Sequence, residues 1–406
     1  MSILDIFRER GFSQQVTHPD MLEKQVKQGQ ICCYTGFDPT ADSLHVGHLI
    51  PIMGLAHMQR AGHRVIALVG GGTAMIGDPS GKTEMRKMLS EENLQQNIDA
   101  MQPQFSRFLD FEQGALLVNN ADWLRSLNYI DFLRDIGRHF SVNRMLSFET
   151  YKVRLETGLS FLEFNYQLLQ AYDFLELYRR YGCVLQMGGD DQWANILSGL
   201  DLIRRMEQKE VYGWTYPLLT TSSGKKMGKT EKGAVWLEAS KTSPYDYYQY
   251  WINTEDGDVK RFLAMFTFLP MEEVNRLGAL KDAEIREAKK VLAYETTALV
   301  HGREEAEKAQ SAAAALFSGS GNIDNVPSSE ISMNRLEQGV SLFEIYQEIG
   351  LTKSRSEARR LLDQGGLYVN QHRIEDEFFQ LTAIHIEDQS IMLRAGKKRY
   401  HRLLVR

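Results

Sequence analysis

Cysteine is scarce in this sequence, and its arrangement excludes two kinds of site. The 406 residues include three cysteines, the adjacent pair Cys32 and Cys33 and the distant Cys183. None of them forms a C-x-x-C pair, so neither a disulfide framework nor a zinc site is predicted, and no metal ligands are assigned. We expect a chain that keeps its thiols reduced, in the cytoplasm.

Long apolar runs and an excess of positive charge are also missing. No stretch reaches the roughly 18 apolar residues that a membrane-spanning helix needs, and residues 1–10 resemble neither a signal peptide nor a transit peptide. The 47 Lys and Arg residues against 53 Asp and Glu residues give a net charge of −6. Binding of a polyanion would therefore depend on local clusters of basic residues.

The pattern of apolar runs indicates an α/β fold. Three short apolar runs read as strands, and helical patterns lie between or after them. The strands are expected at 31–34, 64–70 and 183–188, and the helices at about 47–62, 122–140, 161–181 and 193–207. This alternation predicts a Rossmann-like, doubly wound parallel sheet, whose ligands bind beyond the carboxyl ends of the strands.

Changes in composition divide the rest of the chain. We expect a catalytic domain over residues 1–240 and an all-helical domain over 241–317, where strand signals are almost absent. Residues 318–337 include a stretch rich in Gly, Ser, Asn and Pro, which is typical of a linker. A small α+β domain is expected over 338–406.

Two histidines mark the first candidate site. Tyr34 to His48 reads YTGFDPTADSLHVGH, which places His45 and His48 around Gly47 at the start of a predicted helix. Free N–H groups and the helix dipole favour an anion at such a position, and glycine lets a ligand approach the backbone. The pattern favours a triphosphate site, against the alternative of two surface histidines in a turn.

A cationic segment, Gly224 to Thr230, reads GKKMGKT. Lysine ammonium groups suit phosphate oxygens, and the glycines allow a loop to close over a ligand. Together with HVGH, this segment resembles the paired HIGH and KMSKS motifs of class I aminoacyl-tRNA synthetases. The lysines of that motif match Lys226 and Lys229, whereas Gly228 and Thr230 stand where the consensus has serine.

Two glycine-rich motifs fail. Residues 77–83 lack the glycine that a P-loop needs at position 76, which is isoleucine. Residues 70–75 lack the spacing of a dinucleotide fingerprint, since position 75 is methionine.

The predicted helix at 161–181 carries polar residues on one face. Tyr166, Gln170 and Asp173 are spaced by four and then three residues, which fits either a buried polar site or a solvent-exposed face. With YTGFDPT from Tyr34 and QMGGDDQW from Gln186, this spacing resembles the bacterial tyrosyl-tRNA synthetase family over residues 30–406. At two positions the chain departs from that family, with Asp190 in place of serine and Ala194 in place of glycine, and Asp190 is expected to face solvent.

The resemblance implies a tyrosine pocket. The carboxylate of Asp173 and the hydroxyl of Tyr34 would hold the substrate phenol, and phenylalanine would be penalised because both groups would lose a partner. By the same likeness the substrate ammonium is held by Tyr166, Gln170 and Asp78. Gln192 lies by the carboxylate end, and Gln186 supports the pocket.

The resemblance also implies an ATP site and a two-step reaction. L-Tyrosine attacks the α-phosphorus of ATP, accompanied by Mg²⁺, and the resulting tyrosyl-adenylate then acylates tRNA(Tyr). Thr40 and His45 would meet the γ-phosphate, His48 and Gly47 the nucleotide, and Gly36, Asp38, Gly189 and Asp191 the adenylate. Lys226 and Lys229, helped by Lys82 and Arg86, would close over the pyrophosphate.

The C-terminal residues carry local positive charge. Residues 339–406 contain 11 Lys and Arg residues against nine Asp and Glu residues. Lys353, Arg355, Arg359 and Arg360 cluster at the start of a predicted helix, in a pattern that resembles the S4 RNA-binding domain. The resemblance implies tRNA contacts through phosphates and RNA shape, and the alternative is a small solvated tail.

Other readings stay open at this point. One is a nucleotidyltransferase of the HxGH type that uses no RNA, another is an RNA-binding protein built on an inactive synthetase, and a third is a synthetase for tryptophan. The S4-like segment, the intact histidines and lysines, and Tyr34 with Asp173 favour the tyrosine enzyme. Family likeness further implies a homodimer, formed around residues 139–145.

Overall fold

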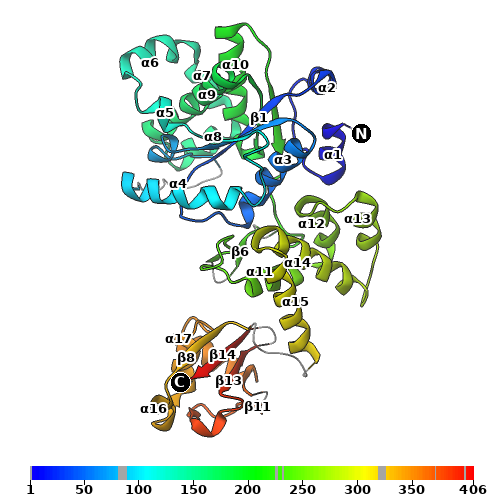
Figure 1. Cartoon of the computed structure of the whole chain (residues 1–406). Coiled ribbons are helices and arrows are strands. Elements are labelled where there is room, and N and C mark those ends of the chain that lie inside the picture. The colour runs from blue at the N-terminus through cyan, green and yellow to red at the C-terminus, as the bar shows by residue number, and fades with distance from the viewer. Residues whose placement is uncertain are drawn as a thin grey trace. The chain divides into compact units, whose positions relative to one another are not determined.

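The computed structural model describes residues 2–80, 89–224, 227–230, 233–318, 326–370, 372–396 and 399–406 (Figure 1). The chain forms two compact units. The larger comprises residues 1–242 and 247–303, and the smaller comprises residues 243–246 and 304–406.

A five-stranded parallel sheet organises the larger unit. Its strands follow the order β3-β2-β1-β4-β5, with all four pairings parallel. They are β1 (Cys32–Phe37), β2 (Arg64–Val69), β3 (Ala115–Asn119), β4 (Cys183–Gly189) and β5 (Tyr212–Tyr216). Chain order runs outward in one direction from β1 and in the other from β4, so the connections diverge between these neighbours and open a crevice at their carboxyl ends. The predicted doubly wound α/β class is confirmed.

Helices cover the sheet (Figure 1). Helix α3 packs against β1 and β2, while α9 and α10 pack on each other and on β4. The helices of this part of the unit are α1 (Ile3–Arg10), α2 (Pro19–Gln28), α3 (Leu49–Arg60), α4 (Glu91–Phe105), α5 (Ala121–Leu124), α6 (Tyr129–Asp135), α7 (Val142–Ser147), α8 (Glu149–Thr157), α9 (Phe161–Tyr181) and α10 (Trp193–Glu207).

Three sequence expectations differ from these elements. Strands β3 and β5 were not expected, since one is a short half-buried run and the other, YGWTY, mixes aromatic residues with glycine. The helix expected over 122–140 is broken into α5, α6 and a 3₁₀ turn. Asn128 starts a new helix there, because its side chain accepts hydrogen bonds from the backbone N–H groups of Ile130 and Asp131.

Local signals at both ends fix α9, the longest of these helices. Ser160 and Glu163 form a capping box, and Gly182 ends the helix in the left-handed region at φ 63°. Glu163 also pairs with the buried guanidinium of Arg154 from α8, with 2.6 Å between nitrogen and oxygen. These contacts fix where α9 begins, and so fix the turns that carry its polar residues.

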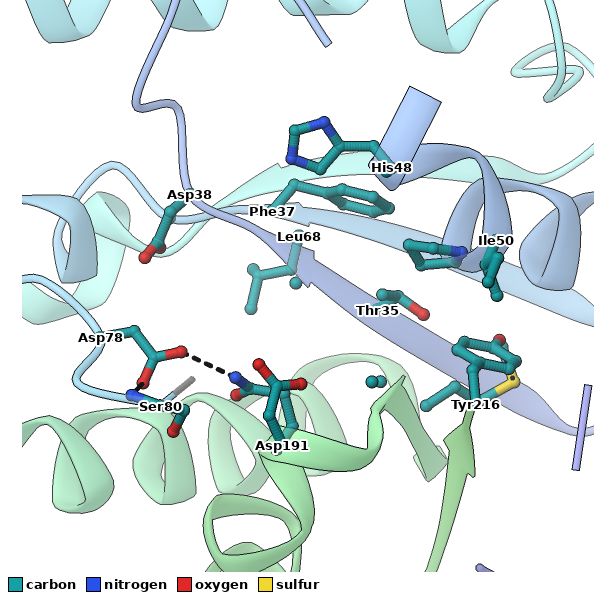
Figure 2. A pocket seen from close by; sticks show the side chains of 18 of the residues that line it. Thr35, Phe37, Asp38, His48, Ile50, Leu68, Asp78, Ser80, Asp191 and Tyr216 are labelled. Atoms are coloured by element: carbon teal, nitrogen blue, oxygen red, sulfur yellow. Dashed lines mark hydrogen bonds between the residues drawn. The ribbon is translucent and has the colours of Figure 1, made fainter. Parts of the chain in front are cut away.

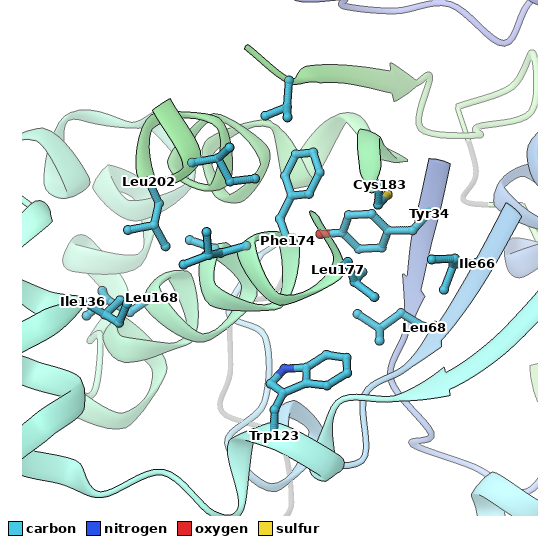
Figure 3. Packing of buried hydrophobic residues seen from close by; sticks show 14 of the residues in the cluster. Tyr34, Ile66, Leu68, Trp123, Ile136, Leu168, Phe174, Leu177, Cys183 and Leu202 are labelled. Atoms are coloured by element: carbon cyan, nitrogen blue, oxygen red, sulfur yellow. The ribbon is translucent and has the colours of Figure 1, made fainter. Parts of the chain in front are cut away.

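A buried apolar cluster joins the sheet to α9 and α10 (Figure 3). Tyr34 of β1 lies in this cluster and meets Phe174 of α9, with ring centroids 5.3 Å apart. Trp123 of α5 belongs to the same cluster. Aromatic packing therefore holds Tyr34 rigidly at the floor of the crevice.

The remaining described residues form helices, a second five-stranded sheet and two two-stranded sheets, one of which pairs β6 (Lys229–Thr230) with β7 (Gly233–Ala234). The helices are α11 (Pro244–Ile252), α12 (Val259–Phe266), α13 (Met271–Gly278), α14 (Ile285–His301) and α15 (Arg303–Ser318). In the smaller unit a sheet of order β11-β10-β13-β14-β8 is built from β8 (Ser328–Ile331), β10 (Leu367–Val369), β11 (His372–Arg373), β13 (Ser390–Ala395) and β14 (Arg399–Val405). Two short strands pair with each other, β9 (Val340–Ser341) and β12 (Gln380–Leu381). The unit also contains the helices α16 (Met333–Glu337), α17 (Leu342–Glu348) and α18 (Arg355–Asp363).

The C-terminal sheet begins inside the segment expected to be a linker. Residues 328–337 form β8 and α16, and β8 pairs in parallel with β14. Composition misled here because Pro327, Ser328 and Ser329 look like loop residues, although Ser328 and Ser329 are paired with β14. The domain boundaries at 240 and 317 stay a prediction.

A close contact between α3 and β5 generates a stability prediction. Gly54 lies inside α3, where alanine ordinarily stabilises a helix by about 1 kcal/mol. A Cβ atom at this position would lie 2.1 Å from the hydroxyl oxygen of Tyr216 and 2.6 Å from its Cζ atom. We expect Gly54→Ala to lower the free energy of unfolding by about 1–3 kcal/mol, measured by urea denaturation.

Gly257→Ala is the matched control. An added Cβ atom there makes only ordinary contacts, 3.7 Å from Ser222. Equal stability of the Gly54→Ala variant and the wild type would contradict the packing described.

Candidate active site

A cleft of about 510 Å³ opens at the carboxyl ends of β1, β2, β4 and β5 (Figure 2). It brings together most of the predicted site residues. All seven of the predicted tyrosine-binding residues line it: Tyr34, Asp78, Tyr166, Gln170, Asp173, Gln186 and Gln192. So do His45, His48, Gly36, Asp38, Gly47, Gly189 and Asp191. Segments that lie far apart in the sequence therefore share one cavity.

The deepest carboxyl group of the cleft is that of Asp173, whose side chain is 2 % exposed. Asn120 Nδ2 donates to its Oδ2 atom at 2.9 Å, and Trp123 Nε1 donates to its Oδ1 atom at 2.8 Å. Burial raises the pKa of Asp173 to about 8, although these two hydrogen bonds act to lower it. Burial thus disfavours the charged form of this carboxyl group.

Tyr34 contributes a second polar group to the same end of the cleft. It is 1 % exposed, and its hydroxyl has no hydrogen-bond partner among the residues that the structure describes. Burial raises the pKa of Tyr34 well above its usual value, with a further contribution from the charge of Asp173. A buried hydroxyl without a partner costs free energy, so this end of the cavity favours a ligand that carries a hydrogen-bonding group at its tip.

Asp38 connects two walls of the cleft. Its Oδ1 atom accepts a hydrogen bond from Thr73 Oγ1 at 3.0 Å, and its Oδ2 atom accepts one from the Tyr166 hydroxyl at 3.2 Å. Asn120 donates to Thr73 at 3.0 Å. The carboxyl groups of Asp38 and Asp173 are therefore linked through fixed donors.

Side-chain amides form a chain of hydrogen bonds along the other wall, which begins at Asp78 (Figure 2). Asp78 accepts from the backbone N–H of Ser80 at 2.9 Å and from Gln192 Nε2 at 2.7 Å. Asn195 Nδ2 donates to Gln192 Oε1 at 3.2 Å and to Gln170 Oε1 at 2.9 Å. Three predicted residues are thus joined through an asparagine that the sequence did not single out.

The two histidines stand at the start of α3. A 3₁₀ turn, Val46–His48, leads into the helix, and Pro51 falls in its first turn, as expected. The imidazoles stack, with centroids 4.0 Å apart and 26° between their planes. Nδ1 of His45 accepts from the backbone N–H of Gly47 at 3.0 Å, and Nδ1 of His48 accepts from the N–H of His45 at 3.1 Å. A neutral imidazole bound in this way carries its proton on Nε2, a donor suited to phosphate oxygen.

The cationic segment approaches these histidines through its backbone. Gly228 has φ 80°, and a Cβ atom on it would lie 3.1 Å from the backbone nitrogen of Gly47. Val235 N–H donates to the Gly228 carbonyl, and Val46 N–H donates to the Val235 carbonyl, both at 2.9 Å. Glycine in place of the family's serine suits both this left-handed backbone and the close approach.

Several predicted residues stay without a test. Lys82, Arg86 and Lys226 lie outside the described residues, and Lys229 is described by its backbone alone. Thr40 is exposed and does not line the cleft.

The expectation that Asp190 faces solvent is wrong. Its Oδ1 atom accepts hydrogen bonds from Gln15 Nε2 and Thr215 Oγ1, both at 2.8 Å, and the residue is half-buried. Asp190 therefore ties the N-terminal segment to β5. Ala194 is buried on α10.

Sequence reasoning also missed Asn120, Trp123, Thr73 and Asn195. Asn120 follows directly after β3, and Thr73 lies shortly after β2. An apolar run that ends in a polar residue was the available signal, but it required β3 to be recognised first. Nothing in the sequence marks Asn195 or Trp123, because their roles depend on contacts with distant segments.

Two features of the described residues concern metal ions and membranes. No group of three or more His, Cys, Asp or Glu residues there is arranged to hold a metal ion. None of the helices there combines the length and apolar character required to cross a membrane.

In the smaller unit, the four predicted RNA-contacting residues are all exposed, Lys353 just before α18 and the three arginines along the helix. Three of them have acidic neighbours. Arg355 lies 3.8 Å from Glu344, Arg359 pairs with Glu377, and the backbone N–H of Lys353 donates to Glu357 at 2.7 Å. Exposed ion pairs of this kind are weak, so a stronger anion can displace them.

Known proteins share this architecture and sequence. The family described as "tRNA synthetases class I (W and Y)" matches residues 26–318, and the family "Tyrosine--tRNA ligase SYY-like C-terminal domain" matches residues 320–403. A tyrosine–tRNA ligase of Caldanaerobacter subterraneus subsp. tengcongensis is 59 % identical over the full length of both chains. One from Clostridium kluyveri is 54 % identical, again over both full lengths.

Among solved structures, a C-terminally truncated mitochondrial tyrosyl-tRNA synthetase of Aspergillus nidulans is similar, with a TM-score of 0.71 and 32 % identity. The match covers 78 % of this chain and 94 % of that one.

The burial of Asp173 generates a prediction for stability against pH. Its pKa is about 8 in the folded protein against an ordinary value of 3.8. The stability that the bound proton contributes is complete below pH 3.8, is lost as pH rises to about 8, and changes no further above that. The Asp173→Asn variant has no such proton to lose. We expect its melting temperature to rise by several degrees relative to wild type between pH 5 and about 8. A constant difference across that range would contradict the buried state of this carboxyl group.

Proposed function

This chain belongs to the tyrosine–tRNA ligases, within the class I tRNA synthetases, and we propose that the cleft at the carboxyl ends of its parallel strands is where both of its substrates react. The enzyme activates L-tyrosine with ATP to form tyrosyl-adenylate and pyrophosphate, and then transfers tyrosine to the 3′ end of tRNA(Tyr). The full-length match to these ligases removes the nucleotidyltransferase, RNA-binding and tryptophan alternatives.

The proposed tyrosine pocket ends at Tyr34 and Asp173. The observation that carries it is a buried Tyr34 hydroxyl that has no partner among the described residues and lies beside a buried carboxyl group. A phenolic hydroxyl can donate to the carboxylate and accept from Tyr34 at the same time. At the other end Tyr166, Gln170 and Asp78 offer oxygens to the substrate ammonium, Gln192 lies by its carboxylate, and Gln186 supports the wall.

The proposed ATP site extends from the histidines to β4. His45 and His48 would donate to phosphate oxygens, and Gly47 lets the nucleotide approach α3. Thr40, which does not line the cleft, is proposed by family likeness alone to meet the γ-phosphate. Gly36, Asp38, Gly189 and Asp191 would hold the adenylate. Burial raises the pKa of Asp191, and the charge of Asp78 raises it further. Lys82, Arg86, Lys226 and Lys229 are proposed, by family likeness, to neutralise the departing pyrophosphate.

Positioning and electrostatic stabilisation suffice for the chemistry. The tyrosine carboxylate would attack the α-phosphorus in line, and its orientation is set by contacts at both ends of the amino acid. Fixed donors at the histidines would stabilise negative charge as it moves to the leaving group. Mg²⁺ is proposed to enter with ATP and to neutralise phosphate charge, and the carboxylates of Asp38 and Asp191 are oxygen ligands of the type it prefers.

The remaining partners are proposed from surfaces. The exposed cations at the start of α18 would contact tRNA phosphates. A homodimer would cover the apolar side chains that α6 to α9 expose around residues 139–145, among them Ile130, Val142, Leu155 and Phe161, which are 51–71 % exposed. A cytoplasmic location follows from the bacterial relatives and their role in charging tRNA.

Amino-acid selection tests the pocket. We expect Tyr34→Phe to lower the preference for tyrosine over phenylalanine by about tenfold, since one hydrogen bond to the substrate hydroxyl is lost. Amino-acid-dependent ATP–pyrophosphate exchange measures kcat/KM for both substrates.

Tyr247→Phe is the matched control for this test. Tyr247 also has a buried hydroxyl without a partner among the described residues, but it does not line the cleft. Unchanged selection in Tyr34→Phe, or an equal loss in Tyr247→Phe, would defeat the pocket assignment.

The salt dependence of tRNA binding tests the C-terminal surface. We expect Arg360→Ala to reduce the slope of log Kd against log salt concentration by about 1, because one phosphate contact is lost. Arg335→Ala serves as the control, since Arg335 is held by two hydrogen bonds to Glu348, at 2.6 and 2.9 Å. The same slope in wild type and Arg360→Ala would argue against a phosphate contact there.

A further inference from the structure

Asn195 occupies an unusual place beside the cleft. It lies in the first turn of α10, is 0 % exposed, and is not among the residues that line the cavity. Its Nδ2 atom faces the side-chain oxygens of Gln170 at 2.9 Å and Gln192 at 3.2 Å. The Ser80 hydroxyl lies further off, at 3.5 Å. This buried asparagine thus donates its two N–H groups to two residues of the proposed tyrosine site.

The direction of these hydrogen bonds is anchored at Asp78. A carboxylate can only accept, so Gln192 must turn its Nε2 atom toward Asp78, at 2.7 Å. Hydrogen bonding from Gln192 also acts to lower the pKa of Asp191, against the burial that raises it. Asp78 therefore faces the nitrogen of Gln192, whose oxygen is left to face Asn195.

The same polarity then passes to Gln170. Because the oxygen of Gln192 accepts from Asn195, the amide of Asn195 must turn its nitrogen toward Gln192. Its Oδ1 atom points the other way and accepts from the buried hydroxyl of Tyr151 at 3.5 Å. The second hydrogen on Nδ2 goes to Gln170, whose amide oxygen is thereby fixed in position.

We propose that Asn195 is a positioning residue for tyrosine, which orients the amides of Gln170 and Gln192 so that the oxygen of Gln170 is presented to the substrate ammonium. This inference rests on the proposed tyrosine pocket. An amide that turned over would present N–H groups to a cation, so the orientation decides whether Gln170 attracts or repels the ammonium. Asparagine suits the position because it alone among side chains of this size offers two donors on one atom and an acceptor on another.

Two isosteric variants separate orientation from packing. Asn195→Leu removes both donors, so that no hydrogen bond from residue 195 orients the amides of Gln170 and Gln192. Aspartate keeps the shape but reverses the polarity, since a carboxylate draws N–H groups toward itself. We expect KM for tyrosine in ATP–pyrophosphate exchange to rise about tenfold in Asn195→Leu and further in Asn195→Asp, while KM for ATP stays within about twofold.

The matched control is Gln167→Leu. Gln167 is also buried between α9 and α10, donates to Ser198 Oγ at 2.6 Å, and does not line the cleft. We expect this variant to lower the melting temperature without a change in KM for tyrosine. If Asn195 were only a packing residue, its variants would likewise lower the melting temperature and leave KM for tyrosine unchanged.

A double-variant cycle tests whether Asn195 acts through Gln170. In a Gln170→Leu background, Asn195→Leu should raise KM for tyrosine by clearly less than in the wild type. Unchanged KM for tyrosine in both Asn195 variants, a parallel rise in KM for ATP, or full additivity with Gln170→Leu would overturn the inference. Wild-type enzyme assayed alongside separates the two claims, because absence of tyrosine-dependent exchange there would contradict the proposed function instead.

Discussion

The site depends on a carboxyl group that is buried away from solvent. Asp173 lies under the cleft with almost no exposure, and the donors of Asn120 and Trp123 partly offset the cost of its burial. Its neighbour Tyr34 is held by aromatic packing, with its hydroxyl buried and without a partner among the described residues. Such an arrangement is costly in the empty protein and is relieved by a ligand that both donates and accepts a hydrogen bond. We propose that in this tyrosine–tRNA ligase that ligand is the phenol of the substrate.

The sheet explains why so many distant segments serve this one cavity. β1 and β4 are neighbours whose connections lead in opposite directions, so the loops after them leave room for a ligand. β1 delivers Tyr34 and Asp38, and β4 delivers Gln186 and the turn that holds Gln192. Helix α9, fixed at its start by a capping box and a buried ion pair, adds Tyr166, Gln170 and Asp173. Helices and strands thus carry the residues that we propose to contact both ends of the substrate tyrosine.

Much of this organisation could be read from the sequence, and the remainder could not, for physical reasons. Apolar runs gave β1, β2 and β4, and the helical spacing of Tyr166, Gln170 and Asp173 indicated that they share one face. Asn120 and Asn195 could not be found in this way, because a polar residue gains its role from partners that only the folded chain brings near. Asp190 was wrongly expected to face solvent because it is charged, whereas its carboxylate accepts hydrogen bonds from Gln15 and Thr215. Periodicity reports which face is buried, but it does not report which polar groups meet there.

A crystal structure of this protein with bound L-tyrosine tests the central claim most directly. The account predicts that the phenolic oxygen lies within about 3.2 Å of both the Tyr34 hydroxyl and a carboxyl oxygen of Asp173, with the ammonium toward Gln170 and Tyr166. The opposite orientation of the amino acid, or a tyrosine bound outside this cleft with the Tyr34 hydroxyl still lacking a partner, would contradict it.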